Sequence, residues 1–301
     1  MSDHNTVCFA LTSIQTSKSS HELLSEFAQF AQKLPDSVNR LIIDMSSVNF
    51  IASNQFAIFG SILHSLKRSK PNIEIVMFGI QKNIANIIGK NGFYRHLNLP
   101  KVQDQYNTVI PYKIFKTSEI IEYGNYLTTN LFSRKDLPNM SSTVRDNIRD
   151  YLLEIFKNAS DHTDSQYIYT CGQYFSKSSL LYFTLVDIGE TIRYNVDMYY
   201  KNSIYPAPEN ALQWALIPGN STINDGSPRG LGLSLIQSFV KLNKGQFFII
   251  SENETYEITS KGERYDIMKN VFPGTIVTLA FNLNDTAMYV MENEVSPEIQ
   301  F

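Results

Sequence analysis

Apolar residues in the first hundred positions follow two alternating patterns. Short, continuously apolar runs predict three strands, of which the second and third are of the kind buried on both faces: 7–11, 40–45 and 73–78. Apolar residues at helical spacing predict helices between and after these strands: 22–33, 55–67 and 81–89, with a last helical turn at 93–97. Strands and helices that alternate at these lengths predict an α/β layer.

The rest of the chain predicts a second α/β region after an irregular stretch at 101–118. Its predicted helices are 118–131, 141–163 and 229–242, and its predicted strands are 166–172, 179–186, 246–251 and 273–281. The stretch 194–228 has no strong periodicity, although 212–216 could form a helical piece within it. A loop of this length in a compact domain is usually functional, often as a lid. We therefore predict two α/β domains, 1–115 and 116–287, and a loose acidic tail, 288–301.

The predicted helix 141–163 carries two stripes. An apolar stripe consists of Val144, Ile148, Leu152, Ile155 and Ala159, and a largely polar stripe consists of Asn147, Tyr151, Glu154, Asn158 and Asp161. Helical geometry stacks the members of each stripe on one face. Glu154 could accept a proton there, and Asn158 could offer an oxygen to a hard cation such as Mg²⁺. The alternative is a solvated polar face, which is the norm on amphipathic helices.

Two glycine-containing segments mark further candidate ligand contacts. Asp187 ends a predicted strand and is followed by Gly189, which lets the backbone turn tightly under a ligand, although an ordinary turn has the same composition. The segment Arg229-Gly230-Leu231-Gly232 begins a predicted helix. Glycines there allow a phosphate to reach the free N–H groups and the positive end of the helix dipole.

Bulk composition narrows the class of protein. The chain has 301 residues, 43% hydrophobic and 18% charged, with a net charge of −3, which fits a soluble globular protein and disfavours direct nucleic-acid contact. We find no apolar run of membrane-spanning length and no signal-peptide pattern at the start. Cys8 and Cys171 lie far apart and the five histidines form no zinc-ligand spacing. These features predict a cytoplasmic protein with no membrane partner.

The order and wording of the first hundred residues resemble a STAS domain, the fold of the anti-sigma-factor antagonists. The matching segments are 41–53 and 91–97. The resemblance implies Ser53 as a phosphoacceptor, because the family often carries a phosphorylated serine at this point. Two departures stand beside it, Ala52 in place of the usual Asp and Asn54-Gln55 in place of Ser-Gly. The alternative is that Ser53 only caps the following helix, as serine commonly does.

Four motifs in the second region occur in the order found in GHKL ATPases, the group that includes histidine kinases, anti-sigma-factor serine kinases, gyrase-type ATPases and ninety-kilodalton chaperones. They are Glu154-x-x-x-Asn158-x-x-x-His162, Asp187-x-Gly189, Gly230-Leu231-Gly232 and Gly274-Thr275. The second region resembles that family over about 170 residues. The resemblance implies the Bergerat fold, an α/β sandwich with helices on one face of a mixed sheet. Thr191 stands where the family usually has a second glycine.

The resemblance also implies a role for each matching residue. Asp187 would accept a hydrogen bond from the adenine amino group, and Thr275 would hold a water beside it. Asn158 would ligate Mg²⁺, and Glu154 would orient or deprotonate the nucleophile. The backbone of Gly230, Leu231 and Gly232 would bind the phosphates, with Arg229 either adding charge there or remaining solvated, while His162 either takes part or only packs against the helix.

Together the two resemblances imply a cytoplasmic regulator that uses ATP and Mg²⁺ to phosphorylate serine or threonine of a protein. The partner would be a sigma-factor-like or antagonist-like regulatory protein, and a homodimer is a family-level expectation. Two alternatives stay open: an ATPase switch that changes its affinity for a partner, and a non-catalytic nucleotide-binding module. A histidine kinase is disfavoured, because His21, His64 and His96 all lie in the first predicted domain and form no phosphoacceptor hairpin.

Overall fold

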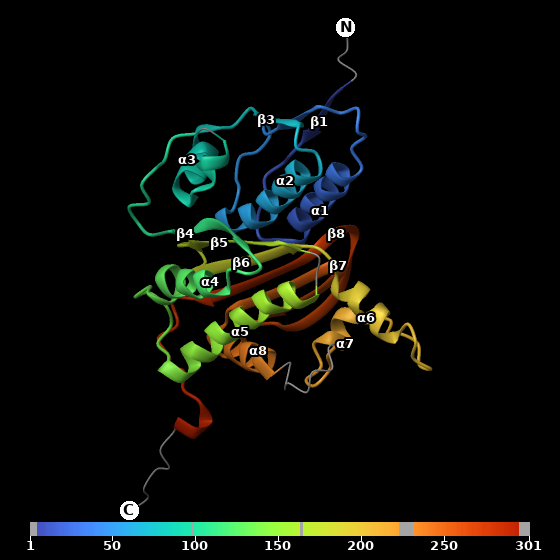
Figure 1. Cartoon of the computed structure of the whole chain (residues 1–301). Coiled ribbons are helices and arrows are strands. Elements are labelled where there is room, and N and C mark those ends of the chain that lie inside the picture. Colours follow the sequence, from blue (N-terminus) through green and yellow to red (C-terminus); the bar gives the residue numbers. More distant parts are fainter. Residues whose placement is uncertain (1–4, 98, 163–164, 223–230, 295–301) are drawn as a thin grey trace, which may run out of the picture.

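The computed structural model describes residues 5–97, 99–162, 165–222 and 231–294. It is a mixed α/β structure with a three-stranded parallel sheet and a five-stranded antiparallel sheet, both accompanied by helices (Figure 1). Among the helices of these described ranges, none is long and apolar enough to cross a membrane.

The first sheet has the strand order β1-β2-β3 and contains the three strands predicted from the apolar runs. They are β1 (Thr6–Ala10), β2 (Arg40–Asp44) and β3 (Glu74–Phe78). The predicted helices are confirmed to within a few residues as α1 (Lys18–Gln32), α2 (Phe56–Ser69) and α3 (Lys82–Asn91), with the short 3-10 helices η1 (Ser53–Gln55) and η2 (Phe93–His96). Helix α1 begins earlier than predicted because Ser17 caps it through the N–H of Ser20.

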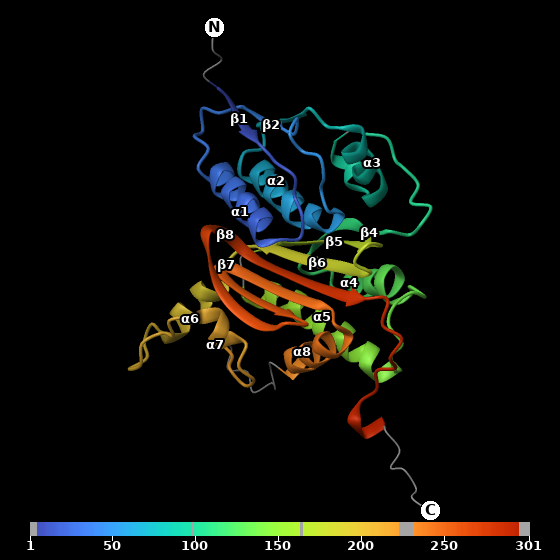
Figure 2. The same ribbon diagram turned by 180° about the vertical axis from the view of Figure 1, so that it is seen from behind.

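The prediction that β2 and β3 are buried on both faces is wrong. Burial alternates along β2, where Leu41 and Ile43 are buried and Ile42 between them is half-exposed, and Phe78 at the end of β3 is 62% exposed. The reason lies in the layer order. Helices α1 and α2 lie between the two sheets and cover only one face of the parallel sheet (Figure 2). The apolar runs did not reveal that none of the described helices or strands covers the second face.

The second sheet has the strand order β4-β5-β6-β8-β7, and every neighbouring pair is antiparallel. The strands are β4 (Val109–Lys116), β5 (Tyr167–Phe175), β6 (Leu180–Ile188), β7 (Gln246–Thr259) and β8 (Gly262–Asn282). The expected mixed sheet is therefore corrected to an antiparallel one. Short turns join β5 to β6 and β7 to β8, and an antiparallel pair needs no longer connection.

Strand β4 lies in the stretch that the sequence analysis treated as irregular. It pairs with β5, although residues 109–116 precede the predicted boundary between the two domains. Pro111 disguised this strand, because proline cannot donate to a ladder. The structure tolerates Pro111 since β4 is the edge strand and its pairing is shifted between Ile110 and Lys113.

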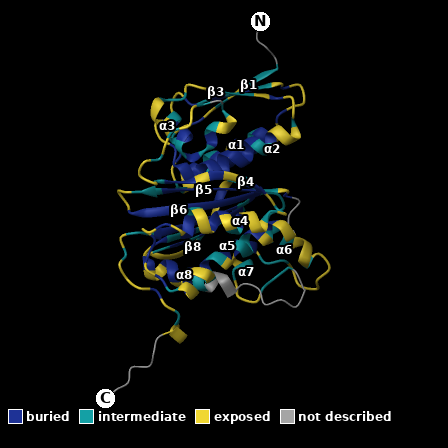
Figure 3. Ribbon diagram, turned by 60° about the vertical axis from the view of Figure 1, so that its left-hand side comes forward, coloured by how far each residue is buried: buried dark blue, intermediate teal, exposed yellow. Residues whose placement is uncertain are grey.

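The five-stranded sheet is covered on both faces (Figure 3). One face packs against α5 (Ser142–His162) and α8 (Leu231–Asn243), together with α4 (Ile120–Leu127), which continues as the π-helical turn η3 (Thr128–Phe132). The other face packs against α1 and α2, where Phe27 and Phe59 share a buried cluster with Cys171 and Ile276 of the sheet. The first sheet and its helices therefore do not form a separate core.

Polar contacts fasten α1 to β8. The carboxylate of Glu22 accepts hydrogen bonds from the backbone N–H groups of Lys269 at 2.7 Å and Asn270 at 2.9 Å. Lys18 forms an ion pair with Asp266 on the same strand at 2.6 Å. This contact fixes the helix against the part of β8 that leads to residues 273–275.

The acidic tail is not loose in the part that the structure describes. Tyr289 pairs with Met140, and the 3-10 helix η4 (Glu292–Glu294) lies beside the start of α5. The Glu294 carboxylate accepts hydrogen bonds from the hydroxyls of Ser141 at 2.7 Å and Thr143 at 2.6 Å. A carboxylate at a helix N-terminus is favourable, because it meets the positive end of the helix dipole.

The contact between α1 and β8 predicts a measurable stabilisation. Replacing Glu22 with Ala removes a carboxylate that satisfies two backbone donors, so we expect the free energy of unfolding to fall by about 1–3 kcal/mol in urea denaturation. Glu26→Ala is the matched control, because Glu26 lies exposed on the same helix. Equal stability losses in the two variants would contradict the assigned role of Glu22.

Candidate functional site

A pocket of about 210 Å³ lies between α5, the five-stranded sheet and two helices at its end. Four residues singled out in the sequence line it: Glu154 and Asn158 from α5, Asp187 from the end of β6, and Thr275 from β8. The structure therefore brings together side chains that three separate elements contribute. This convergence is the strongest sign that the pocket is functional.

Helix α5 supplies one wall of the pocket. Tyr151, Glu154 and Asn158 follow one another at helical spacing and all line it. The neighbouring apolar stripe is buried as predicted, except that Ile155 is only partly buried, and Phe156 outside the stripe is fully buried. Two members of the stripe, Ile155 and Ala159, also line the pocket. The predicted polar stripe is thus only partly a pocket wall, since Asp161 near the end of the helix is exposed.

Asp187 is a buried carboxylate at the base of the pocket. Its side chain is 8% exposed, and the atom Oδ1 has no hydrogen-bond partner within the part of the chain that the structure describes. Burial raises the pKa of Asp187 to about 7, and a backbone N–H from Thr275 only partly offsets this. A buried acceptor without a partner costs free energy, so it is suited to receive a donor from a ligand.

The backbone under Asp187 depends on a glycine in the neighbouring strand. Gly274 has φ +159°, and a Cβ built on it would lie 2.1 Å from the carbonyl oxygen of Asp187. Gly189 donates its N–H to the carbonyl of Pro273 at 3.2 Å, and the next residue, Glu190, lines the pocket. Gly189 and Gly274 therefore both shape the backbone around Asp187: Gly274 leaves room for its carbonyl group, and Gly189 pairs with the neighbouring strand.

Thr275 is held in place by a short chain of hydrogen bonds. Its hydroxyl lies 3.2 Å from the hydroxyl of Ser251 on β7. Ser251 in turn accepts a hydrogen bond from the N–H of Ile192 at 2.9 Å. Ser251 was not identified in the sequence, because its role depends on the register that places it opposite Thr275.

The outer wall of the pocket comes from the region predicted to lack periodicity. It contains α6 (Ile192–Tyr200), which contributes Ile192, Asn195 and Val196, and α7 (Ala211–Ala215), which contributes Trp214. The sequence analysis expected α7 but missed α6. The signal was present in Thr191, whose hydroxyl accepts the N–H of Tyr194 at 3.2 Å and caps the helix. Thr191 therefore has a structural reason to replace a glycine.

The predicted phosphate-binding segment is described only in part. Leu231 and Gly232 are the first two residues of α8. Arg229 and Gly230 lie outside the described residues. His162 is the last residue of α5, and its side chain is likewise not described.

Ser53 lies outside the pocket lining, at the junction between the first unit and the five-stranded sheet. It is fully buried, its N–H donates to the side chain of Gln173, and Cys171 Sγ lies 3.0 Å from its carbonyl oxygen. The prediction that Ser53 caps the following helix is wrong. Its hydroxyl makes no capping bond at η1 and has no hydrogen-bond partner among the described residues. Ser53 is the first residue of η1, and Ala52, which has no side-chain oxygen, holds the capping position.

Metal-ligand chemistry in the described ranges is sparse. They contain no cluster of three or more His, Cys, Asp or Glu side chains placed to hold a metal. Comparison with known proteins adds no assignment: no protein-family model matches the chain, and no curated protein matches it.

The raised pKa of Asp187 predicts a pH-dependent penalty. Between about pH 4 and pH 7 the carboxyl is ionised in the unfolded chain but protonated in the folded one, so the folded state binds more protons and its stability falls as the pH rises. Asp187→Asn lacks this penalty. We expect its free energy of unfolding, relative to that of the unmodified chain, to rise by more than ~1 kcal/mol between pH 4 and pH 8. A difference independent of pH would contradict the assignment.

Gly274 predicts a second measurable effect. Ala at this position would force the Asp187 backbone away, so we expect Gly274→Ala to lower the free energy of unfolding by ~2 kcal/mol or more in urea denaturation. Gly262→Ala is the matched control, because Gly262 lies in the same strand at φ +117° with open space around its Cβ position. Equal losses in the two variants would show that backbone conformation, and not the contact with Asp187, causes the effect.

Proposed function

We propose that this chain binds an adenine nucleotide in the pocket and acts as a Mg²⁺- and ATP-dependent serine/threonine protein kinase of the anti-sigma-factor type. In this proposal the five-stranded unit is a GHKL-type nucleotide-binding domain and the first unit is a STAS-like domain. The observation that carries the proposal is an oxygen of Asp187 that has no hydrogen-bond partner among the described residues and lies in the same pocket as Glu154 and Asn158.

The chemistry of Asp187 suits an adenine ring. The exocyclic amino group of adenine is a donor, and a buried acceptor without a partner discriminates strongly for a group that satisfies it. Thr275 lies beside Asp187 in the strand register and offers a hydroxyl to the same edge of the base, directly or through a water. Donation to the carboxylate favours its ionised form, so binding should lower the pKa of Asp187 from about 7 and release protons.

The residues present are compatible with a Mg²⁺ ion carried on the nucleotide. Asn158 supplies an amide oxygen in the pocket, and Mg²⁺ is commonly held by one or two side chains together with phosphate oxygens. The ion would neutralise phosphate charge. Leu231 and Gly232 would offer the backbone N–H groups that begin α8 to the phosphates, with Arg229 and Gly230 just before them.

Glu154 is placed to act on an attacking hydroxyl. It lies one helical turn before Asn158 on the same face of α5 and lines the same pocket. A carboxylate there can orient the serine or threonine of a protein substrate and accept its proton during transfer.

The second candidate function is an ATPase switch or a non-catalytic module. The burial of Ser53 favours this candidate over self-phosphorylation, since a kinase cannot reach that hydroxyl while the two units are packed together.

Replacing Glu154 separates catalysis from binding. We expect Glu154→Ala to lower multiple-turnover ADP formation from Mg·ATP by ~100-fold or more while ADP affinity stays within ~3-fold, because the lost group acts on the proton and not on the base. Asp161→Asn is the matched control on the exposed end of the same helix. Asp187→Ala should instead abolish ADP binding in calorimetry.

The outcomes also separate the candidate functions. Unchanged turnover in Glu154→Ala would end the catalytic role of Glu154, and ADP binding without turnover in the unmodified chain would leave the non-catalytic module. Intact mass after incubation with Mg·ATP, with Ser53→Ala in parallel, tests self-phosphorylation, which we expect to be absent in the packed chain.

A further inference from the structure

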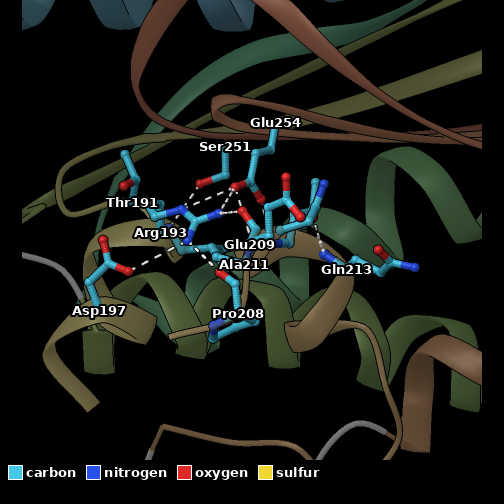
Figure 4. A network of polar contacts seen from close by, with 12 residues as sticks. Thr191, Arg193, Asp197, Pro208, Glu209, Ala211, Gln213, Ser251 and Glu254 are labelled. Atoms are coloured by element: carbon cyan, nitrogen blue, oxygen red, sulfur yellow. Dashed lines mark hydrogen bonds and ion pairs between the residues drawn. The ribbon is translucent and has the colours of Figure 1, made fainter. Parts of the chain in front are cut away.

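The outer wall of the pocket is tied to strand β7 by one buried carboxylate. Glu254 is 4% exposed, and its oxygens accept hydrogen bonds from three residues (Figure 4). Arg193 of α6 donates through Nε at 3.1 Å and through Nη2. Ala211 and Leu212 of α7 donate their backbone N–H groups at 3.2 Å and 2.6 Å. A single side chain of β7 therefore holds the first turns of both helices.

Arg193 extends this connection to the loop that joins the two helices. Its Nη1 donates to the carbonyl oxygen of Pro208 at 2.8 Å, and its Nη2 also donates to the carbonyl oxygen of Glu209. Asp197, one turn further along α6, lies 3.5 Å from Nη1. The planar guanidinium can reach the carboxylate and both carbonyls at once, which a lysine ammonium on the same backbone cannot do.

Helix α7 depends on these contacts for its position. It has only five residues, which is too short for a helix to be stable in water by itself. Asn210 caps it by accepting the N–H of Gln213 at 2.6 Å, and Glu254 satisfies two more of its free N–H groups. The capped helix places Trp214 against the pocket, where the ring also packs against Tyr199 and Tyr200 of α6.

The connection reaches the candidate site directly. Ile192, the neighbour of Arg193, lines the pocket and donates its N–H to Ser251, which is hydrogen-bonded to Thr275. Asn195 and other residues of α6 line the same wall. Moving Arg193 would therefore move both the wall and the support of Thr275.

We propose that Arg193 and Glu254 are positioning residues that hold α6 and α7 as a closed wall over the pocket and thereby slow the release of a bound nucleotide. The part of this proposal that concerns nucleotide release rests on the proposed function. The part that concerns the wall rests only on the contacts above. A buried ion pair contributes little net stability but leaves an uncompensated charge when one partner is removed, so single substitutions should loosen the wall.

The test compares Arg193→Gln, Arg193→Lys and Glu254→Gln with Arg264→Gln. Arg264 pairs with Glu257 at 3.0 Å on the same two strands, β7 and β8, but the side chains are 62% and 26% exposed. The first measurement is amide hydrogen exchange over residues 192–216 in the protein without nucleotide. We expect exchange ~10-fold faster in Arg193→Gln and Glu254→Gln, an intermediate effect in Arg193→Lys, and no change in Arg264→Gln.

The second measurement is the dissociation rate of a fluorescent ADP analogue by stopped flow. We expect a rise of ~10-fold or more in Arg193→Gln and Glu254→Gln with little change in the association rate. Because Arg193 is partly exposed, at 21%, its variants keep the test valid if Glu254→Gln does not fold.

Each result decides one part of the proposal. Unchanged exchange over 192–216 would overturn the positioning role. Faster exchange with ADP release equal to that of Arg264→Gln would overturn the effect on nucleotide release. Absence of ADP binding to the unmodified protein would contradict both the proposed function and the effect on nucleotide release. The hydrogen-exchange measurement would still test the positioning role of Arg193 and Glu254.

Discussion

Burial of both faces of the five-stranded antiparallel sheet is the constraint on which this structure depends. Helices α5 and α8 cover one face, and α1 and α2 cover the other. An antiparallel sheet can leave one face in water, but this one carries Tyr169, Cys171 and Ile276 on the face toward α1 and α2. The first unit and the five-stranded sheet therefore share one buried cluster.

This arrangement places the candidate site and the contact with the first unit on one continuous strand. Strand β8 contacts Glu22 of α1 at Lys269 and Asn270, and a few residues later it supplies Thr275 to the pocket. Any change in the packing of α1 acts on a strand that also supports Asp187. The same packing buries Ser53 against β5. Phosphorylation of its hydroxyl would therefore require the first unit to separate from the five-stranded sheet.

The pocket keeps a polar group in a costly environment. Asp187 is buried, and one of its oxygens has no partner in the part of the chain that the structure describes. Its pKa of about 7 means that its ionised form is disfavoured below neutral pH. A buried carboxylate without a partner lowers the stability of the protein without ligand, and selection for folding alone would not keep it. Glu254 is buried to a similar extent, but its oxygens are satisfied by Arg193 and by the N–H groups of α7. Glu254 therefore supports the structure around it, whereas Asp187 keeps an acceptor for the ligand contact proposed above.

The sequence by itself determined the helices and strands with strong periodicity, and the stripe on α5 that places Glu154 and Asn158 together. Helical spacing is a local property, so these features needed no knowledge of distant contacts. Strand β4 was missed because its edge position, which makes Pro111 acceptable, exists only in the assembled sheet. Helix α6 was missed because an aromatic-rich polar segment lacks a clear apolar stripe, although Thr191 was a usable capping signal.

Only the tertiary structure decided which polar residues meet and which faces are covered. The sequence singled out Asp187 and Thr275 separately, but strand register made them neighbours, and the approach of Gly274 to the Asp187 backbone follows from that register. The pairing of Arg193 with Glu254 joins residues about sixty positions apart, and no local pattern encodes such a contact. Burial, the pKa of Asp187 and the sealing of Ser53 depend on packing between layers, which arises only when the whole chain is folded.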